Sequence, residues 1–497
     1  MLFIPDDQDL MRQFFDPRPE LTLTPIERIL LPLDSRDELP PTLAGLQWLW
    51  MHPTLKPEVL RLLQQKVLAD KQPTGRPGMD LWQILVLGVV RLGLDANYDR
   101  LEDLANHHTL LRQMLGLPPC PWGELARRFH HQTLRDNVCL VDAPLLQQIN
   151  ALVAAAGREV FHCGPGPVPA PLAIKVDTYV LETDVHFPTD LNLLFDAGRK
   201  CLDLIEKYRD QYGYQLPGWR KLDDWRVRFK AAERVASKAA FGGGKDKEKR
   251  VRAAVGDYVA VGRELECKVT ASLLSLCDQP VDAADWDCLA YFEQMLDKHL
   301  DLVDRRLLQG QSIPSAEKLF SLFEPHTEWI TKGKLHPPVE LGHRLLVATD
   351  QHGLIQDYDV LVAEVDVNQS VPVASRLLGR YGEGGLASIS FDKGFTRSGD
   401  RELLELYIPE VVMPKRGKKS VVEAAAESSK QFIALRRQHS AVESDIAALE
   451  HHGLNRCLDV GLEAYRRYVG YGVLSFNLHQ IGRRLLEQKR AAVSVAA

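Results

Sequence analysis

Apolar residues recur every three or four positions through residues 1 to about 160, and no alternating strand pattern interrupts them. One of these stripes consists of Leu60, Leu63, Val67 and Leu68. A second consists of Leu81, Ile84, Leu85 and Val89. A further helix is expected from about Leu101, and another from a cap at Thr133 to about Ala156. Because this spacing is typical of amphipathic helices, we predict a helical N-terminal region over residues 1–160.

The pattern changes at a Gly- and Pro-rich loop, residues 164–169. The run Leu172–Leu181 predicts a strand, a turn and the start of a second strand. Helical spacing returns from Leu191 to about Phe323, broken by the flexible segment Phe241–Lys247. Further elements are predicted as strands at 344–348, 354–362, 386–391 and 411–413, and as helix from about 424 to 488. Chain order therefore predicts one α/β domain, in segments 170–196 and 331–497, split by a helical insertion at 197–330.

Composition limits the class of protein. The 497 residues carry a formal net charge of −6, so DNA contacts would have to come from local basic patches. The eight cysteines form no C-x-x-C pair, which excludes the common zinc-finger spacings. The longest apolar stretch, Ile84–Val90, is too short to span a bilayer, and the N-terminus lacks a signal-peptide pattern. We therefore expect a cytoplasmic protein with no membrane partner.

Three acidic residues stand out by their positions on the predicted elements. Asp177 follows an apolar strand, Asp392 follows the strand that ends at Phe391, and Glu443 lies on a helix. Carboxylates from separated segments can hold the hard divalent cations that clamp both oxygens in phosphoryl transfer. A strand that ends in Asp is nevertheless more often a turn or a helix cap. Asp350, closely followed by a glycine, is interpreted as such a turn residue.

The helix around Glu443 offers basic neighbours. Glu443 lies at the edge of an apolar stripe made by Val442, Ile446 and Leu449. His439 lies one turn before Glu443 and Arg436 two turns before it, on the same face. This arrangement suits a site for metal and phosphate, but an ion pair on a solvated face explains the same spacing equally well.

Five blocks resemble, in collinear order, the DDE transposases of bacterial insertion sequences. The blocks are Val176–Thr178 with Glu182–Asp190, Trp329–Lys334 with Val339–Gly342, Phe391–Phe395, Met413–Gly417, and Ala441–Ser444 with Gly453–Cys457. Within that class the chain resembles the ISNCY-type transposases, whose N-terminal domain is similar around Thr74–Pro77. The gaps of 215 residues from Asp177 to Asp392 and of 51 from Asp392 to Glu443 fit members with an inserted domain.

The resemblance implies an RNase H-like catalytic domain, in which Asp177, Asp392 and Glu443 bind Mg²⁺, with Mn²⁺ as a substitute. The implied activity is hydrolysis of DNA at the element's ends, after which the freed 3′-hydroxyl attacks target DNA. The implied partners are double-stranded DNA, as terminal inverted repeats and as target, and further copies of the chain in a dimer or higher oligomer.

Basic residues in and around these blocks are the candidate DNA contacts: Lys332, Lys334, Lys415, Arg416, Lys418, Lys419, Arg436 and His439. From Val411 to the end, 14 Lys and Arg stand against 8 Asp and Glu, a local excess that can neutralise phosphates. Related families place a tyrosine, an arginine and a lysine around the glutamate. The matching positions are Arg436, His439 and Glu450, and Glu450 cannot bind phosphate.

The helical N-terminal region is expected to read the inverted repeats, with one helix of a helix-turn-helix in the major groove. Its candidate contacts are Arg76, Arg127, Arg128 and Arg135. An ordinary helical bundle with solvated arginines is the alternative for this region.

Three other functions compete with a transposase. The first is a nuclease on the same fold that cuts without joining, and only a strand-transfer assay separates it. The second is a DNA-binding regulator without activity, which the presence of all three acids disfavours. The third is a structural helical protein, which leaves the ordered acidic blocks unexplained.

Overall fold

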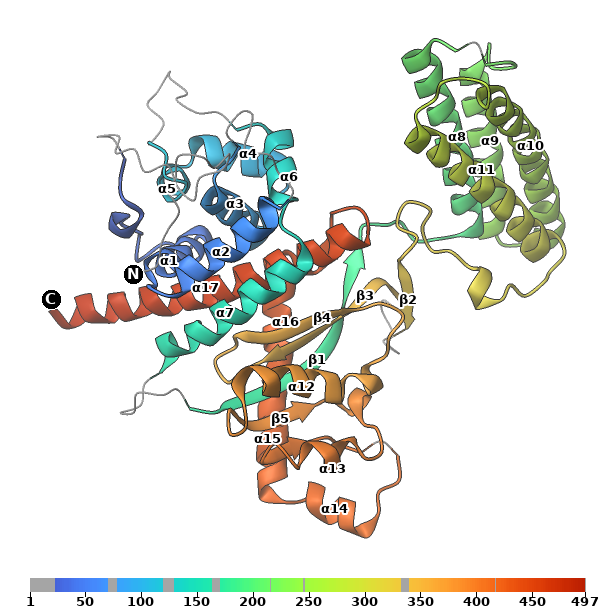
Figure 1. Ribbon diagram of the computed structural model, residues 1–497. Coiled ribbons are helices and arrows are strands. Elements are labelled where there is room, and N and C mark those ends of the chain that lie inside the picture. Colours follow the sequence, from blue (N-terminus) through green and yellow to red (C-terminus); the bar gives the residue numbers. More distant parts are fainter. Residues whose placement is uncertain are drawn as a thin grey trace. The chain divides into compact units, whose positions relative to one another are not determined.

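The computed structural model describes residues 23–69, 78–118, 129–162, 170–214, 216–244, 246–331, 339–415 and 417–496. The described chain is mixed α/β, mostly helical, with a mixed sheet (Figure 1). It divides into two compact units, one of residues 1–184 with 330–497 and one of residues 185–329. The helical N-terminal region, predicted as a separate domain, therefore belongs to the same unit as most of the sheet.

The sheet contains β1 (Leu172–Thr183), β2 (Glu328–Thr331), β3 (Val339–Thr349), β4 (Ile355–Leu361), β5 (Leu386–Phe391), β6 (Glu410–Val412) and β7 (Arg456–Cys457). Its order is β2-β3-β1-β5-β6, with β4 also paired to β3 and β7 to β1. β3 runs antiparallel to β1 and β4, whereas β5 runs parallel to β1 and β6. The predicted strands 344–348, 354–362, 386–391 and 411–413 correspond to β3, β4, β5 and β6.

The turn predicted within Leu172–Leu181 is wrong, because β1 is one unbroken strand of 12 residues. It pairs with β3 from Lys175 to Glu182 and with β5 from Leu172 to Val176. These two ladders satisfy the backbone groups of β1 on both sides, which a local sequence pattern does not reveal.

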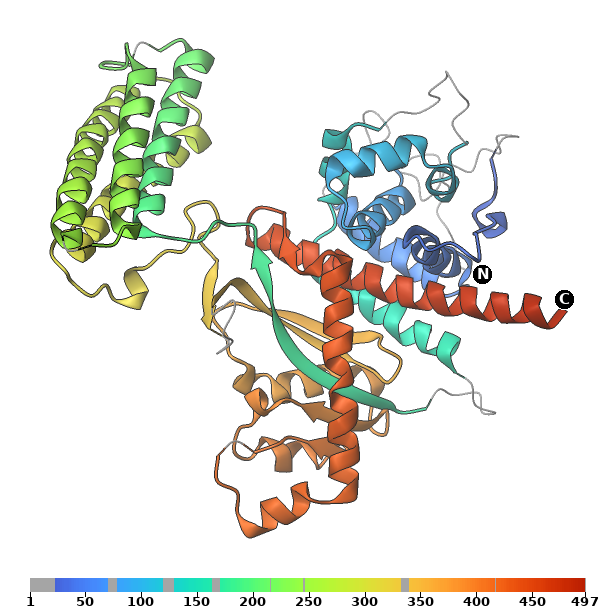
Figure 2. The same ribbon diagram turned by 180° about the vertical axis from the view of Figure 1, so that it is seen from behind.

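The two faces of β1 meet different helices, because successive side chains of a strand point to opposite faces. Ile174 and Val176 join an apolar cluster with residues of α12 (Ser370–Tyr381) and α13 (Asp400–Leu404). On the opposite face, Tyr179 and Leu181 join the cluster of the N-terminal helices. α15 (Lys430–His439) and α16 (Ala441–Leu449) cross the sheet on the side away from α12, as Figures 1 and 2 show together.

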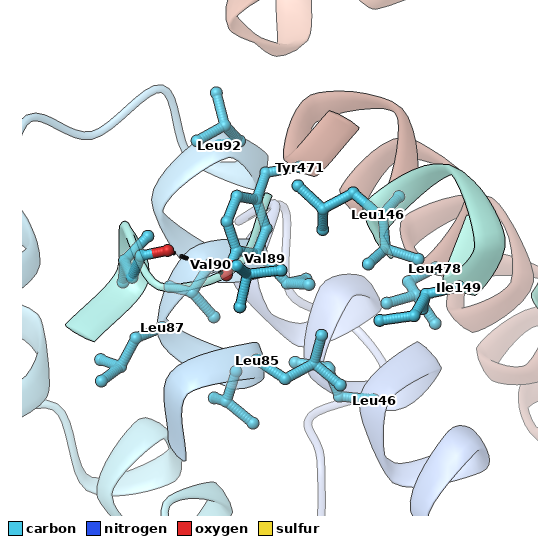
Figure 3. Packing of buried hydrophobic residues seen from close by; sticks show 14 of the residues in the cluster. Leu46, Leu85, Leu87, Val89, Val90, Leu92, Leu146, Ile149, Tyr471 and Leu478 are labelled. Atoms are coloured by element: carbon cyan, nitrogen blue, oxygen red, sulfur yellow. Dashed lines mark hydrogen bonds between the residues drawn. The ribbon is translucent and has the colours of Figure 1, made fainter. Parts of the chain in front are cut away.

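The N-terminal helices are α1 (Leu39–Met51), α2 (Leu55–Val67), α3 (Leu81–Gly93), α4 (Tyr98–His107), α5 (Thr109–Met114), α6 (His131–Val138) and α7 (Ala143–Phe161). The 35-residue helix α17 (Leu462–Ala496) packs against α1, α3 and α7. Figure 3 shows Tyr471 and Leu478 of α17 among apolar side chains of those three helices. A Cβ at Gly88 would lie 2.1 Å from the Tyr471 ring, so a glycine is needed there. The C-terminal helix thus completes a core with the N-terminal helices.

Two predicted helices are interrupted. The helix expected from Thr133 to Ala156 is two helices, α6 and α7, because Asp142 caps a new start by accepting from the Leu145 N–H at 3.1 Å. The helix expected from 424 to 488 is divided into α14 (Val421–Glu427), α15, α16, the π-helical turn η6 (Glu450–Leu454), strand β7 and α17. Gly453, with φ +85°, ends the helical path before β7.

The second unit holds α8 (Asp190–Tyr212), α9 (Leu222–Phe241), α10 (Lys247–Leu276) and α11 (Ala283–Val303) around its own apolar core. This unit begins at Val185, before the predicted boundary at 197. Its first helix, α8, already begins at Asp190, where Thr189 caps it by accepting from the Asn192 N–H at 3.1 Å. The predicted break at Phe241–Lys247 coincides with the end of α9 and the start of α10. Strand β2 already begins at Glu328, inside the predicted insertion.

The short helical turns are η1 (Ile26–Arg28), η2 (Asp304–Leu308), η3 (Ser315–Glu317), η4 (Asp366–Asn368) and η5 (Lys393–Phe395). No single described helix is long and apolar enough to cross a bilayer, and only the bent pair α6–α7 reaches that length and composition when joined.

Candidate active site

Three elements bring the predicted acids to one end of β5. Val176 of β1 pairs with Phe391 of β5 in parallel register, so the next residues are Asp177, still within β1, and Asp392, just after the end of β5. Glu443 lies in the first turn of α16, which contacts β1. Asp177 is partly buried, whereas Asp392 and Glu443 are exposed.

The acids interact through their charges. Burial and, to a smaller extent, the nearby carboxylates of Asp392, Asp366 and Glu443 together raise the pKa of Asp177 to about 6. The opposing effect is a hydrogen bond from the Thr178 N–H to Oδ1 of Asp177, at 2.7 Å. Asp177 is thus held where its negative charge is unfavourable, which is typical of a carboxylate whose partner is a cation.

The carboxylate of Asp392 does not serve the local turn. Asp392 precedes η5, and its backbone carbonyl accepts from the Phe395 N–H at 3.2 Å, but its side chain forms no capping hydrogen bond. The alternative interpretation of Asp392 as a cap therefore lacks its characteristic contact.

Asp350 shows what a structural aspartate looks like in this fold. It is fully buried, and its Oδ1 accepts from the backbone N–H groups of His352 and Leu354, at 2.8 and 3.0 Å. Its Oδ2 accepts from the Gln356 side chain at 2.7 Å. Gly353, at φ +77°, completes the turn. The interpretation of Asp350 as a turn residue is confirmed.

A partly buried network docks α16 on the sheet. The Lys175 ammonium lies 2.9 Å from Oδ2 of Asp445, and the Thr349 hydroxyl donates to the same oxygen at 2.7 Å. Lys175 and Thr349 are paired neighbours on β1 and β3. Asp445 lies two residues after Glu443, so this network fixes the turn of helix that carries Glu443. No sequence pattern indicates this network, because its members are distant in the chain.

His439 lies at the junction of α15 and α16. Its Nδ1 is 3.0 Å from the Ser390 hydroxyl on β5. Burial lowers the pKa of His439, and Lys175 and Arg436 lower it further, whereas Asp392 and Glu443 act in the opposite direction. A neutral imidazole therefore lies beside the acidic cluster, one turn before Glu443 as predicted. Arg436 is exposed.

Two of the lysines that are predicted to contact DNA form ion pairs within the chain. Lys415 lies 2.6 Å from Glu423, and Lys419 lies 2.5 Å from Glu427. Lys418 is exposed on the same loop, and Arg135 is exposed on α6. The remaining candidates lie outside the described residues: Arg76, Arg127, Arg128, Lys332, Lys334 and Arg416.

Asp366 is a further acid that sequence analysis did not single out. Its Oδ1 accepts from the Thr178 hydroxyl at 3.1 Å and lies 3.8 Å from Nε of Arg344. Because Thr178 follows Asp177 on the strand, its side chain points to the opposite face. Asp366 therefore adds negative charge near Asp177 from the other side of the sheet.

Three of the five sequence blocks that resemble those of DDE transposases meet along β1. Glu182 pairs with Gly342 of β3 on one side and with Arg456 of β7 on the other. The Arg456 guanidinium lies 3.2 Å from Glu182 and 3.6 Å from Asp184. A Cβ at Gly342 would lie 2.0 Å from the Leu181 carbonyl oxygen, so glycine permits this close pairing.

The donor set of the acidic cluster, all carboxylate oxygens, fits Mg²⁺ or Mn²⁺. Within the described part of the chain, however, the group of three ligand atoms that lie within 4.8 Å of one another is formed by Glu38, His452 and His479. The exposed side chains of Asp392 and Glu443 would have to rotate to bring their oxygens closer to Asp177. Comparisons of the chain with family models, curated proteins and solved structures found no match.

Proposed function

We propose that this protein is a DNA transposase that cleaves and joins strands with a DDE triad in an RNase H-like domain. The main support is that β1, the end of the adjacent strand β5 and helix α16 bring Asp177, Asp392 and Glu443 together. The three acids lie close enough for the other two to raise the pKa of Asp177. The mixed sheet with helices on both faces, and the helical unit between β1 and β2, support the same proposal.

In this proposal the chain supplies three oxygen ligands on well-supported elements. Bound Mg²⁺, or Mn²⁺ in its place, would supply the positive charge that stabilises the attacking and leaving oxygens of the scissile phosphate. Asp177 is held by β1, Asp392 by the end of β5, and Glu443 by the helix that Asp445 anchors. A neutral His439 places no fixed positive charge beside these ligands, where it would repel a cation.

DNA binding is part of the same proposal. Exposed Lys418 and Arg436 lie on the loop before α14 and on α15, the elements that lead to Glu443, so they suit contacts to the strand being cut. We assign end recognition to the N-terminal helices, and we expect a dimer or higher oligomer on DNA in the bacterial cytoplasm.

The test uses the full-length protein and a duplex carrying the DNA that flanks its coding sequence. With Mg²⁺, the wild type should nick this duplex and join the 3′ end to a second duplex. Asp392→Asn and Glu443→Gln should bind the duplex in a gel shift but fail to nick it, because phosphate affinity comes from basic residues elsewhere. Glu402→Gln, which removes an exposed charge on α13, is the matched control and should retain activity.

Each failure has its own meaning. Near-normal nicking by Asp392→Asn would refute the metal role of that residue. Nicking without joining by the wild type would favour the nuclease alternative. Loss of binding together with a lower melting temperature in Asp392→Asn would assign Asp392 to the turn.

A further inference from the structure

A second cluster of ligand-type side chains lies away from the acidic triad, in the layer of N-terminal helices. Glu38 immediately precedes α1, His452 lies in η6, and His479 lies on α17. One ligand atom from each of the three lies within 4.8 Å of the other two. All three residues belong to the unit formed by residues 1–184 and 330–497.

The buried imidazole of His479 forms no hydrogen bond, although a carboxylate lies beside it. The residue is 4% exposed, and neither ring nitrogen has a hydrogen-bond partner. Nε2 lies 2.7 Å from Oε2 of Glu38, but the pair does not have hydrogen-bond geometry. The His452 ring lies beside it, with 4.7 Å between ring centroids. The ring nitrogens therefore have unused hydrogen-bonding capacity that faces a carboxylate and a second imidazole, an arrangement that suits a bound cation.

The cluster is open to solvent on one side. Glu38 is exposed and His452 is half-buried, so an ion can reach the cluster from solvent.

The backbone around the cluster is closely packed. α1 and α17 touch at two glycines: a Cβ at Gly45 would lie 2.0 Å from the Leu478 carbonyl oxygen, and one at Gly482 would lie 1.9 Å from that of Pro41. His452 precedes Gly453, whose carbonyl accepts from the Tyr468 hydroxyl at 2.9 Å. Ligands on supported backbone keep their geometry with little entropic cost.

We propose that Glu38, His452 and His479 bind one divalent transition-metal ion of the zinc class. Two imidazoles and a carboxylate form a ligand set that suits Zn²⁺ or Co²⁺, and a fourth position would take water. Around a tetrahedral ion with bonds of about 2.0–2.1 Å, neighbouring ligand atoms lie roughly 3.3 Å apart. Small side-chain movements therefore close the cluster around an ion.

The ion would join three segments that are distant in the sequence. It would tie the start of α1 and the middle of α17 to η6, which continues directly from α16. Glu443 lies on α16, so a metal at His452 would hold the far end of the helix that carries this acid. The ion would therefore join these segments, and its nitrogen-containing ligand set separates the site from the all-oxygen acidic cluster.

The test measures metal uptake by the full-length protein, prepared without a polyhistidine tag and freed of metal by a chelator. Titration with Co²⁺ is followed by visible absorption, and bound Zn²⁺ is counted by mass spectrometry after dialysis. We expect one ion per chain in the wild type, retained in a large excess of Mg²⁺. His452→Gln and Glu38→Gln should each weaken binding at least tenfold. His451→Gln, which changes the exposed neighbouring histidine, should bind like the wild type.

Asp392→Asn separates this site from the acidic cluster and should leave the Co²⁺ spectrum unchanged. Loss of the spectrum in that variant, with its retention in His452→Gln, would place the ion at the acidic cluster and overturn the proposal. Equal affinities of the wild type, Glu38→Gln and His452→Gln would overturn it as well. Because the assay contains no DNA, its outcome is independent of the proposed transposase activity.

Discussion

Asp177 lies on β1 and Asp350 lies in the turn that directly follows the neighbouring antiparallel strand β3, yet the surroundings of the two carboxylates are opposite. Burial raises the pKa of both. Around Asp350 the other contacts lower that pKa again: two backbone N–H groups, the Gln356 amide and the charge of His352. Around Asp177 a single backbone N–H lowers the pKa, whereas three neighbouring carboxylates raise it.

The comparison distinguishes Asp350, whose hydrogen bonds stabilise the fold, from Asp177, whose charged form is unfavourable in the fold. Asp350 meets its hydrogen-bonding needs inside its own turn, so its removal should harm stability. Asp177 is left with unbalanced negative charge, which a bound cation would neutralise. Such unfavourable placement is more informative about function than position at the end of a strand.

The largest expected effect is on activity. Asp177→Asn should reduce Mg²⁺-dependent nicking by roughly a thousandfold or more, about 4 kcal/mol of transition-state stabilisation. Asp350→Asn should leave nicking per folded molecule near the wild-type value. Both are measured as single-turnover rates on the same duplex, with the folded fraction determined by circular dichroism. Equal losses in the two variants would erase the distinction between the two aspartates.

Stability should respond in the reverse order. Asp350→Ala should lower the free energy of unfolding by roughly 3 kcal/mol, because it leaves three donors without an acceptor, two of them buried. At pH 4, where the carboxyl group is neutral, Asp177→Ala should lower it by less than about 1 kcal/mol, since Asp177 accepts from one backbone N–H. Urea unfolding followed by circular dichroism gives both values. A larger loss for Asp177→Ala would make Asp177 the structural residue.

The pH dependence sharpens the comparison. The pKa of Asp177 is about 6 in the folded chain and about 3.9 when unfolded, so its stabilising contribution is full below 3.9 and is lost as pH rises through 6. Asn stays neutral throughout. Asp177→Asn should therefore be more stable than the wild type by roughly 1–2 kcal/mol at pH 7.5 and about equal to it at pH 4. Urea unfolding at the two pH values measures this, and a gain that persists at pH 4 would contradict it.

The smallest expected effect is that of the cation on stability. At tenfold excess over its dissociation constant, Mg²⁺ should stabilise the wild type by about 1.4 kcal/mol, a shift of a few degrees in melting temperature. The shift should be absent in Asp177→Asn and preserved in Asp350→Asn at pH 7.5. An equal shift in all three proteins would place Mg²⁺ binding elsewhere.

The sequence by itself determined the helical blocks, the positions of four strands, the role of Asp350 and the three acids worth testing. Helical periodicity, strand patterning and the Asp-to-Gly turn are local signals, written within a few consecutive residues. The interruptions at Asp142 and Gly453 are local as well, but their polar and glycine signals were outweighed by apolar spacing that runs through them.

Only the tertiary structure decided which distant segments meet. The register of β1 on β5 put Asp177 beside Asp392, and the Lys175–Asp445 contact docked the helix of Glu443. The packing of α17 on the N-terminal helices brought His479 to Glu38, a pair that no spacing in the chain suggests. Such contacts depend on how separate surfaces pack together, and no periodic pattern along one segment encodes its partner.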